Sequence, residues 1–515
     1  MSDPEVVVAG GGHNALVAAA YLARAGVSVQ VLEASAGFGG AVQSARVFPG
    51  VDARLSRLSY LVSLLPQVIA DDLGLDLELR SRPVASYTPV GSRGLLIERH
   101  PGEATRRSFA GLAGSDREWA DWQALEERIA GFARVVAPTL TAPLPAAAEL
   151  QAALGDDELW AALTKRPIGA LIEAALGHDT VRGVVLTDAL IGTFATAHDP
   201  GLQQNVCFTY HVIGGGTGEW KVPVGGMGRV ADTLVDAARR FGATLRAGAE
   251  VRGLDLVDGG VRVRLAGEVL EAPYVVAGCA PATLARLLGR PAERPAGCQT
   301  KINLLLRRLP SFRSGVDPAT GFAGTLHLNQ GYAQLQRAYE QARAGGLPDP
   351  LPAEVYCHTL TDDSILAPEL RAAGWHTLTM FALHTPAGLF TSDPDGTRAS
   401  VRDAALRSLQ SVLAEPLEDS LAVDGRGEAC VEVMTPLDVE REVGMPGGHI
   451  FHGDLSWPWR SDDAEPDSPA ERWGVATEDP SILLGSAGAV RGGGVSGLGG
   501  HNAAMALLEL TGRAP

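Results

Sequence analysis

The chain has 515 residues, which is enough for two or three domains with a sizeable core. Hydrophobic residues make up 46% of it and charged residues 20%, which excludes a disordered chain and indicates a globular protein. The 60 acidic and 43 basic residues give a net charge of −17, which argues against nucleic acid and anionic membrane surfaces as partners.

The sequence carries no visible sign of secretion or membrane insertion. Its five cysteines include no C-x-x-C pair, and an odd count fits a reducing compartment. The acidic start leads directly into an apolar run, so no signal peptide is visible. No apolar run reaches about 18 residues, and Tyr60–Ala70 is short and broken by Pro66. We therefore expect a cytoplasmic protein without an integral membrane segment, and a peripheral membrane location stays open.

The first forty residues contain a strand–turn–helix–strand unit. Val6–Ala9 is apolar and mostly β-branched, which predicts a buried strand. The turn Gly10–Ala15 follows, and Leu16–Ala25 is rich in Ala and Leu, which predicts a helix. Val27–Leu32 predicts a second strand, with Glu33 directly after it. This order matches the dinucleotide-binding fingerprint.

The chemistry of nucleotide binding explains the spacing of this turn. Gly10 permits a tight turn, Gly12 lets the backbone approach a pyrophosphate, and Ala15 keeps helix and strand close. The helix start, with His13 and Asn14, presents free N–H groups and the positive end of the helix dipole to the phosphates. The alternative is a glycine-rich structural turn without a ligand.

The residues after the second strand favour FAD over NAD. Glu33, about 20 residues after the turn, is placed to accept hydrogen bonds from the adenosine ribose hydroxyls, and Ala34 follows it. The cluster that includes Gly39 and Gly40 comes next. Its position resembles the Glu-then-Gly-Gly pattern of FAD-binding flavoproteins such as amine oxidases and phytoene desaturases. Ala41 stands where many of those proteins carry an arginine.

The middle of the chain has a coarser pattern. Leu58–Leu65 predicts a helix over the nucleotide domain, and residues 116–190 have helical periodicity with a break at Pro138–Pro145. Ile213–Gly218 is rich in glycine, but no helix start follows it, so we expect a turn. The remaining predictions are a helix at Val230–Phe241 and strands at Leu77–Leu79, Leu95–Glu98, Ala243–Arg246, Val251–Leu254, Val261–Leu265 and Pro273–Ala277.

A second glycine-rich turn lies near the C-terminus. Ile482–Leu484 predicts a strand, Gly485–Gly497 a turn and Ala503–Leu510 a helix. The turn matches the fingerprint by letter, but the sequence ends about 18 residues later, so no second nucleotide-binding unit is expected to follow. We expect it to belong to the first domain, as a second helix N-terminus aimed at the same ligand. The alternative is a packing turn.

Together these motifs resemble the phytoene-desaturase-like flavoproteins of the flavin amine oxidase fold. The nearest resemblance is to their pyridine-nucleotide-disulphide-oxidoreductase-domain branch, which includes relatives of carotenoid desaturases and ketolases. The matching stretches span nearly the whole chain and are Gly10–Asn14, Val224–Gly228, Lys301–Asn303, Thr435–Asp438, Gly444–Asp454 and Gly492–Val495.

This resemblance implies an α/β fold with a Rossmann-like FAD-binding domain, into which an α+β substrate domain is inserted. The FAD domain would comprise residues 1–90, 222–298 and 471–515, and the substrate domain residues 91–221 and 299–470. Val251 would hold the adenine through its backbone, and Gly494 and Val495 would present N–H groups to the flavin pyrimidine. Gly485 and Ser486 stand where many relatives have Gly-Asp.

The resemblance also implies an FAD-dependent oxidoreductase of the desaturase or dehydrogenase type. A hydride would pass from a substrate C–H to flavin N5 and leave a C=C or C=N bond, with oxygen or a quinone-like acceptor as oxidant. We expect a small, largely apolar substrate. One alternative is an amine or amino-acid oxidase, which would have polar groups and a carboxylate clamp at its site rather than an apolar tunnel. The other is a non-catalytic escort protein, as Rab GDP-dissociation inhibitors are.

Two residues are candidates for catalysis. Lys301 opens an apolar strand, and in flavin amine oxidases a lysine in a similar place holds a water beside flavin N5; the alternative is an exposed lysine at a strand end. Arg491 lies within the closing turn and could bind a substrate carboxylate, a phosphate or a surface acid. His449 and His452 are three residues apart, but no acid accompanies them in a clear ligand spacing, so no metal is expected.

Overall fold

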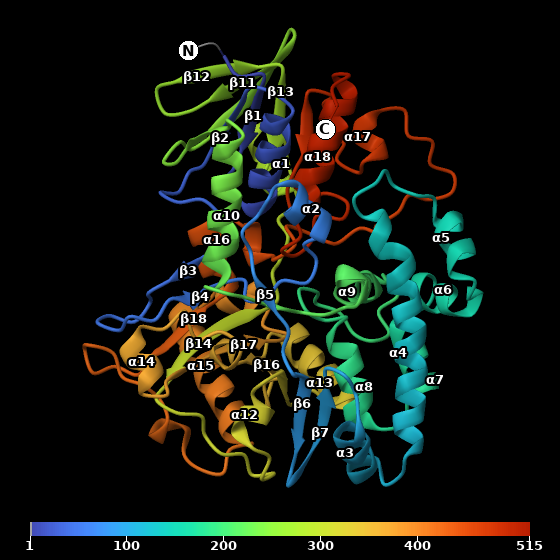
Figure 1. The fold of residues 1–515 in the computed structure, drawn as a ribbon, viewed down its shortest axis with the longest axis vertical. Helices are drawn as coiled ribbons and strands as arrows, with labels where there is room; N and C mark the ends of the chain where they lie inside the picture. Colours follow the sequence, from blue (N-terminus) through green and yellow to red (C-terminus); the bar gives the residue numbers. More distant parts are fainter. Residues whose placement is uncertain (1–2, 515) are drawn as a thin grey trace.

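Two β-sheets at opposite ends of the molecule carry the fold (Figure 1). The computed structural model describes residues 3–514. A five-stranded sheet with helices on its faces forms one end, where both ends of the chain also lie, and a seven-stranded sheet forms the other. A group of helices flanks the second sheet on one side.

The five-stranded sheet is parallel throughout and is built from segments far apart in the sequence. Its strands are apolar and buried on both faces, as expected for a parallel sheet between helices. In spatial order they are β19 (Ile482–Leu484), β13 (Tyr274–Ala277), β1 (Val6–Ala9), β2 (Val29–Leu32) and β9 (Thr244–Arg246). A three-stranded antiparallel sheet, β10 (Gly253–Val257), β11 (Gly260–Arg264) and β12 (Val269–Ala272), lies beside it.

Small residues let three helices pack closely on this sheet. Helix α1 (His13–Arg24) connects β1 to β2 and contacts α18 (Leu498–Leu510) and α10 (Met227–Arg240). A side chain at Gly500 of α18 would stand 1.7 Å from the carbonyl oxygen of Asn14, so only glycine permits this approach. The helix after the C-terminal turn is thereby pressed against the helix after the first turn.

The seven-stranded sheet is mixed, because β15 pairs with β6 in parallel and its other neighbours pair antiparallel. All seven residues of β14 are buried, and α15 (Pro394–Gln410) packs on the face that carries Ile302 and Leu304. In spatial order the strands are β18 (Val431–Met434), β14 (Thr300–Leu306), β17 (His376–Ala382), β16 (Ala353–Tyr356), β15 (Thr325–Leu328), β6 (Val84–Val90) and β7 (Arg93–Glu98).

The helical group stands beside the seven-stranded sheet. Three of its helices, α4, α8 and α9, contribute side chains to the cavity described below. The helices of this group are α3 (Glu103–Ala113), α4 (Arg117–Val136), α5 (Ala147–Leu154), α6 (Asp157–Thr164), α7 (Ile168–Ala175), α8 (Asp179–Thr187) and α9 (Gln203–Val212). No helix within residues 3–514 is long and apolar enough to cross a membrane.

The remaining elements are short and connect these layers. The strands are β3 (Ser44–Ala45), β4 (Leu55–Ser56), β5 (Leu79–Arg80) and β8 (Val222–Pro223), and the α-helices are α2 (Gln67–Asp72), α11 (Pro281–Leu287), α12 (Pro318–Gly321), α13 (Tyr332–Arg343), α14 (Pro368–Ala372), α16 (Pro436–Val443) and α17 (Pro469–Arg472). Short 3-10 helices lie at Ala137–Thr139, Gly214–Gly216, His358–Leu360, Ala387–Phe390, Leu417–Asp419 and Pro446–Gly448.

The helix predicted at Leu58–Leu65 is wrong. This segment is extended and irregular, and Val62 forms a bridge to Lys221. Its apolar residues are buried by contacts with other parts of the chain, and Lys301 of β14 donates to the carbonyl of Leu58 at its start. Tertiary contacts therefore override the local apolar pattern. The helical region 116–190 and the turn at 213–218 are confirmed, while α18 begins at Leu498, five residues before the predicted start.

The strand pairings bear on the domain boundaries. The parallel sheet takes its strands from the three segments assigned to the FAD domain, 1–90, 222–298 and 471–515. However, β6 belongs to the seven-stranded sheet, so a boundary at residue 90 separates β6 from its hairpin partner β7. We propose that the first segment of the FAD domain ends before Val84.

Candidate active site

A cavity of about 780 Å³ runs between the two sheets. One end lies at the turn between β1 and α1, and the other lies between the seven-stranded sheet and helices α4, α8 and α9. Both glycine-rich turns contribute to its lining. Its size is that of a site for a cofactor or small molecule.

The first turn leaves open space where its sequence predicts a pyrophosphate. Gly10 has a φ of +108°, a conformation that residues with a side chain rarely adopt. Gly12 is the N-cap of α1 with a φ of −69°, which any residue tolerates, and a Cβ there would meet no protein atom within 4 Å. Nothing in the protein therefore explains the missing side chain of Gly12, whereas a phosphate at the start of α1 does.

Glu33 is held rigidly at the same end of the cavity. Its Oε2 accepts a hydrogen bond of 2.7 Å from the N–H of Gly11, and its Oε1 accepts one of 2.7 Å from the N–H of Ser35. These bonds fix the carboxylate in the lining, where its remaining lone pairs can accept from ribose hydroxyls. Val251 lines this end as well.

The two glycine-rich turns meet through side chains of α1. His13 Nε2 lies 3.1 Å from the carbonyl oxygen of Gly494, and Asn14 donates to the carbonyl of Gly492 at 3.4 Å. Burial lowers the pKa of His13 to about 4, so its imidazole is neutral at pH 7. His452 lines the cavity nearby, and its buried Nδ1 has no hydrogen-bond partner among residues 3–514. An unpaired polar nitrogen of this kind suits a polar cofactor.

The structure brings most of the predicted cofactor residues together. Those that line the cavity are Gly10, Gly12, His13, Asn14, Glu33, Ala34, Gly39, Gly40, Ala41, Val251, Ser486, Gly494 and Val495. Ala15 and Gly485 do not line it. Ala15 packs against Gly278 at the end of β13, and a side chain at Gly485 would collide with Val276, so both residues serve the packing behind the turns.

Lys301 lies inside the molecule and lines the cavity. Only 3% of its surface is exposed, so the alternative of an exposed strand-end lysine is wrong. Its Nζ donates to the carbonyls of Ser56 and Leu58 at 2.6 and 2.7 Å and lies 5.0 Å from the ring centre of Tyr60. Burial holds the pKa of Lys301 well below its usual range, partly offset by Glu432. The amine is therefore suited to accept or hold a proton.

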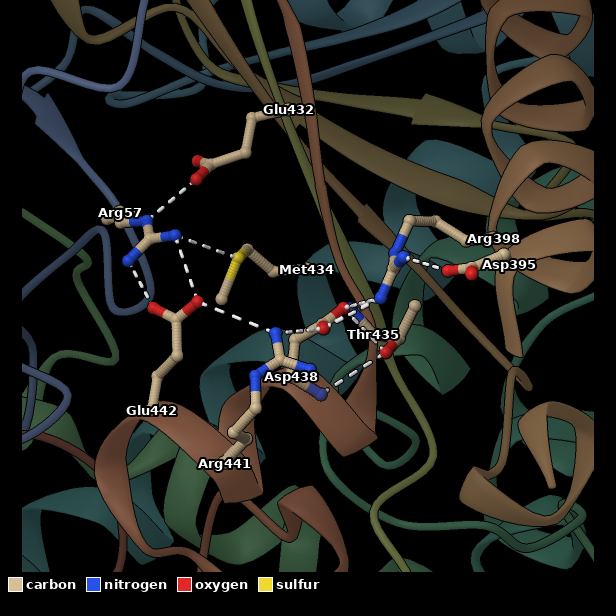
Figure 2. Close-up of polar contacts among 9 residues, drawn as sticks. All are labelled: Arg57, Asp395, Arg398, Glu432, Met434, Thr435, Asp438, Arg441 and Glu442. Atoms are coloured by element: carbon tan, nitrogen blue, oxygen red, sulfur yellow. Dashed lines mark hydrogen bonds and ion pairs between the residues drawn. The ribbon is translucent and has the colours of Figure 1, made fainter.

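An ion-pair network anchors the segment that Lys301 binds (Figure 2). Arg57 donates through Nε to Glu432 of β18 at 2.7 Å, and its guanidinium also pairs with Glu442 of α16. Asn303 of β14 donates both to Glu432 at 2.9 Å and to the carbonyl of Arg57 at 3.1 Å. Residues 56–58 are thus held from both sides, which positions the carbonyls that bind Lys301.

We expect Arg57→Met to destabilise the protein by about 2–3 kcal/mol, because Glu432 would keep only the neutral amide of Asn303 as a partner and Glu442 only Arg441, 3.8 Å away. The three side chains expose only 15–27% of their surface, so water compensates them poorly. Denaturant unfolding followed by far-UV circular dichroism measures the loss. The control is Arg46→Met, which removes the exposed pair with Asp52 and should leave the midpoint unchanged. Equal midpoints for both variants would contradict the role of this network.

The structure corrects the expectation for Arg491. Its side chain is fully buried and does not line the cavity. Its guanidinium donates to the backbone carbonyls of Pro458 and Leu140 at 2.9 and 3.3 Å and to that of Ala142. Because these bonds turn the charge toward the protein, Arg491 joins the closing turn to two other loops and is not available to a substrate carboxylate.

The far end of the cavity has a polar floor that the sequence did not reveal. The strand register sets Lys301 opposite Phe381, Phe381 opposite Glu354, and Glu354 opposite His327, so these four residues form one row across the sheet. All four line the cavity. Tyr356 donates to Glu354 Oε2 at 2.5 Å, and its ring lies 4.8 Å from that of Tyr60.

Three carboxyl groups converge on this end. Glu354 comes from the sheet, while Glu126 of α4 and Asp188, directly after α8, come from the helices. Burial, reinforced by Asp188, raises the pKa of Glu354 to about 8. Burial also raises the pKa of Asp188 to about 7, and burial together with the charge of Asp188 raises that of Glu126 to about 7. Perturbed carboxyls in a cavity are typical of functional sites.

Sequence reasoning missed these residues because they come from separate segments. The only local signal was a charged or polar residue within a short apolar strand, as at Glu354 and His327. The missed polar and aromatic lining residues are Tyr60, Arg82, Arg99, Glu126, Asp188, His211, Trp220, Gln299, His327, Glu354 and Tyr356. Within residues 3–514 no group of three or more His, Cys, Asp or Glu is arranged to hold a metal ion.

Comparisons with known proteins agree with this architecture. An uncharacterized protein of Mycobacterium tuberculosis is 48% identical over 523 residues, covering 98% of this chain and 97% of its own. Pyridine nucleotide-disulfide oxidoreductase domain-containing protein 2 of Rattus norvegicus is 29% identical over 562 residues, covering 98% and 93%. The solved structure of cyclohexylamine oxidase from Brevibacterium oxydans has a TM-score of 0.58 at 16% identity, covering 99% of this chain and 100% of its own, which shows a shared fold.

The family follows from a model described as flavin containing amine oxidoreductase, which matches residues 16–424 and so most of the chain. The open space at Gly12, the fixed carboxylate of Glu33 and the unpaired Nδ1 of His452 fit an FAD molecule. The family match supports an enzyme rather than the escort protein that the sequence left as an alternative. The chain belongs to the flavin-containing amine oxidoreductase family and is an FAD-dependent oxidoreductase.

Proposed function

We propose that this enzyme oxidises the C–N bond of a small amine. The observation that carries this proposal is the group of three carboxyls, Glu354, Asp188 and Glu126, at the end of the cavity that also holds Lys301. An ammonium group entering there would pair with carboxylates that otherwise lack a cationic partner within 4 Å, apart from the neutral His327 beside Glu354. We further propose that the cofactor residues named from the sequence contact FAD as expected, except Ala15 and Gly485.

In the proposed oxidation of the amine, atoms and electrons balance with bound FAD as the only oxidant. The substrate loses a hydride from carbon and a proton from nitrogen and becomes an imine, which water hydrolyses to a carbonyl compound and ammonia. Bound FAD supplies the two-electron acceptor. The carboxyls orient the ammonium group, and Lys301, with its lowered pKa, is the proposed proton acceptor or electrostatic stabiliser.

The desaturation of a largely apolar substrate, which the sequence favoured, fits the lining less well. An apolar chain in this end of the cavity would remove Glu354, Asp188 and Arg82 from water without giving them an opposite charge. Apolar lining residues of α4 and α8, such as Ile129 and Val185, leave room for a hydrophobic substituent on an amine. Because desaturation fits this lining less well than amine oxidation does, it is the second candidate function.

The test is a substrate screen with the FAD-loaded enzyme under anaerobic conditions. Loss of the oxidised flavin absorbance on mixing with primary and secondary amines supports amine oxidation, and detection of the carbonyl product identifies the bond that was broken. Bleaching by an apolar alkane or polyene, with no response to any amine, would overturn the proposal in favour of the desaturase.

Amine binding should tighten as the pH rises from 6 to 8.5. Below their raised pKa values of about 7 and 8, Asp188 and Glu354 are protonated and neutral. Above these values they are anions that attract an ammonium group, which itself stays charged to about pH 10. We expect KM to fall about tenfold over this range. Glu354→Gln should remove the part of the fall in KM that occurs near pH 8. Glu127→Gln, which changes an exposed side chain of α4, should leave the whole fall unchanged. A flat profile in the wild type would contradict the assignment.

We propose oxygen or a quinone-like molecule as electron acceptor and expect NADPH to be a poor reductant. In the part of the chain that the structure describes, both glycine-rich turns face the same cavity, which leaves no second turn for a nicotinamide nucleotide. Anaerobic stopped-flow mixing of the enzyme with NADPH measures the rate. Rapid stoichiometric bleaching of the flavin would refute this prediction.

A further inference from the structure

Arg82 is a buried cation that lines the cavity and has no acid in ion-pair contact among residues 3–514. It precedes β6, lines the cavity and exposes only 5% of its surface. No carboxylate within residues 3–514 lies within 4 Å of its guanidinium. Its one hydrogen bond runs to Thr325 Oγ1 at 3.3 Å, and its Nε has no partner.

A second arginine lies beside it. Arg99 follows β7, lines the cavity and exposes 21% of its side chain. Its Nε lies 3.5 Å from Glu219 Oε1, too far for a hydrogen bond, and both atoms lack one. The positive charge of Arg99 disfavours the charged form of Arg82. Two guanidinium groups therefore lie close together at this end of the cavity, and neither forms a hydrogen bond with a carboxylate among residues 3–514. Glu354 of the same lining attracts the charge of Arg82 without contacting it.

The arrangement differs from that of the structural arginines in the same protein. Arg491 is equally buried but donates to three backbone carbonyls, and Arg57 is paired with two carboxylates. A buried guanidinium without such partners is unfavourable unless a ligand supplies them. Its planar fork matches a carboxylate, and the ring of Tyr356 supports it, with the guanidinium carbon 5.5 Å from the ring centre.

We propose that Arg82, with Arg99 beside it, is a carboxylate-binding subsite, so that the substrate is an amine that also carries a carboxylate. This deepens the proposed function and rests on it: the acids Glu354, Asp188 and Glu126 would receive the ammonium group, and the arginines would receive the carboxylate. The substrate class is thus an amino acid or a similar zwitterion, and Arg82 decides specificity rather than the chemistry of the C–N bond.

The test measures binding rather than turnover. FAD-loaded wild-type enzyme is titrated with benzoate, which cannot be oxidised at a C–N bond, and binding is followed by the change in the visible flavin spectrum. We expect saturable binding that Arg82→Met weakens at least tenfold, because a charge-assisted, two-pronged contact is lost. Arg82→Lys keeps the positive charge but not the forked guanidinium. Its affinity for benzoate should therefore lie between those of the wild type and Arg82→Met. Benzamide should bind both proteins equally, and Arg107→Met, on an exposed side chain of α3, should bind benzoate like the wild type.

Each outcome decides the subsite separately from the proposed function. If benzoate does not bind the wild type, or binds Arg82→Met as tightly, the subsite is refuted even when amines bleach the flavin. If no amine bleaches the flavin but benzoate binding depends on Arg82, the carboxylate subsite is supported and the proposed amine oxidation is refuted. Inorganic phosphate that binds more tightly than benzoate and depends on Arg82 would overturn the carboxylate assignment. Should Arg82→Met fail to retain FAD, the comparison of Arg82→Lys with the wild type decides.

Discussion

Gly12→Asp is expected to abolish FAD binding, with an affinity loss of at least about 100-fold. The Cβ of residue 12 would point into open space at the start of α1 and meet no atom of residues 3–514 within 4 Å. Its carboxylate would occupy the place of the pyrophosphate and repel it electrostatically. Absorbance of the purified protein near the flavin maximum, and titration of the apoprotein with FAD, measure the effect.

Two control variants separate this effect from misfolding. Gly111→Asp changes an exposed glycine of α3 whose Cβ would also meet no atom within 4 Å, and it should retain FAD. Gly12→Ala is compatible with the φ of −69° and adds only a methyl group, so it should weaken FAD binding less than the aspartate does. A yellow Gly12→Asp protein with normal FAD affinity would refute the assignment of this turn to the cofactor.

Lys301→Met is expected to slow flavin reduction or reoxidation by about 100-fold while FAD stays bound. The substitution keeps the length of the side chain and removes the amine that donates to the carbonyls of Ser56 and Leu58. Those carbonyls lose their partner, so thermal stability should fall as well. Anaerobic reduction by an amine substrate and reoxidation by oxygen, each in stopped flow, measure the two half-reactions.

The matched control is Lys165→Met, which replaces an exposed lysine after α6 and should change neither half-reaction. If Lys301→Met keeps FAD and both rates equal those of the wild type, Lys301 only binds the segment 56–58 and has no catalytic role. Slowing of reduction alone points to proton transfer from the substrate, and slowing of reoxidation alone points to the reaction with the acceptor.

The sequence by itself determined the nucleotide-binding part of this protein. The strand β1, the turn at Gly10–Ala15, the helix α1 and the strand β2 follow one another directly, so local apolar runs and glycine spacing were sufficient to predict them. The C-terminal turn, which the sequence assigned to the first domain, lines the same cavity. Such units can be predicted from the sequence because all their residues lie in one short segment.

The tertiary structure alone decided the other end of the cavity. Glu126, Asp188, Glu354 and Arg82 come from segments up to about 270 residues apart, and no local pattern indicates that they share a wall. Tertiary contacts also reversed two local predictions: Leu58–Leu65 is not helical and bonds to Lys301 and Lys221, and Arg491 donates to backbone carbonyls. The physical reason is that tertiary packing decides which groups lie next to a buried charge. The groups around this cavity come together only when the two sheets and the helices have packed around it.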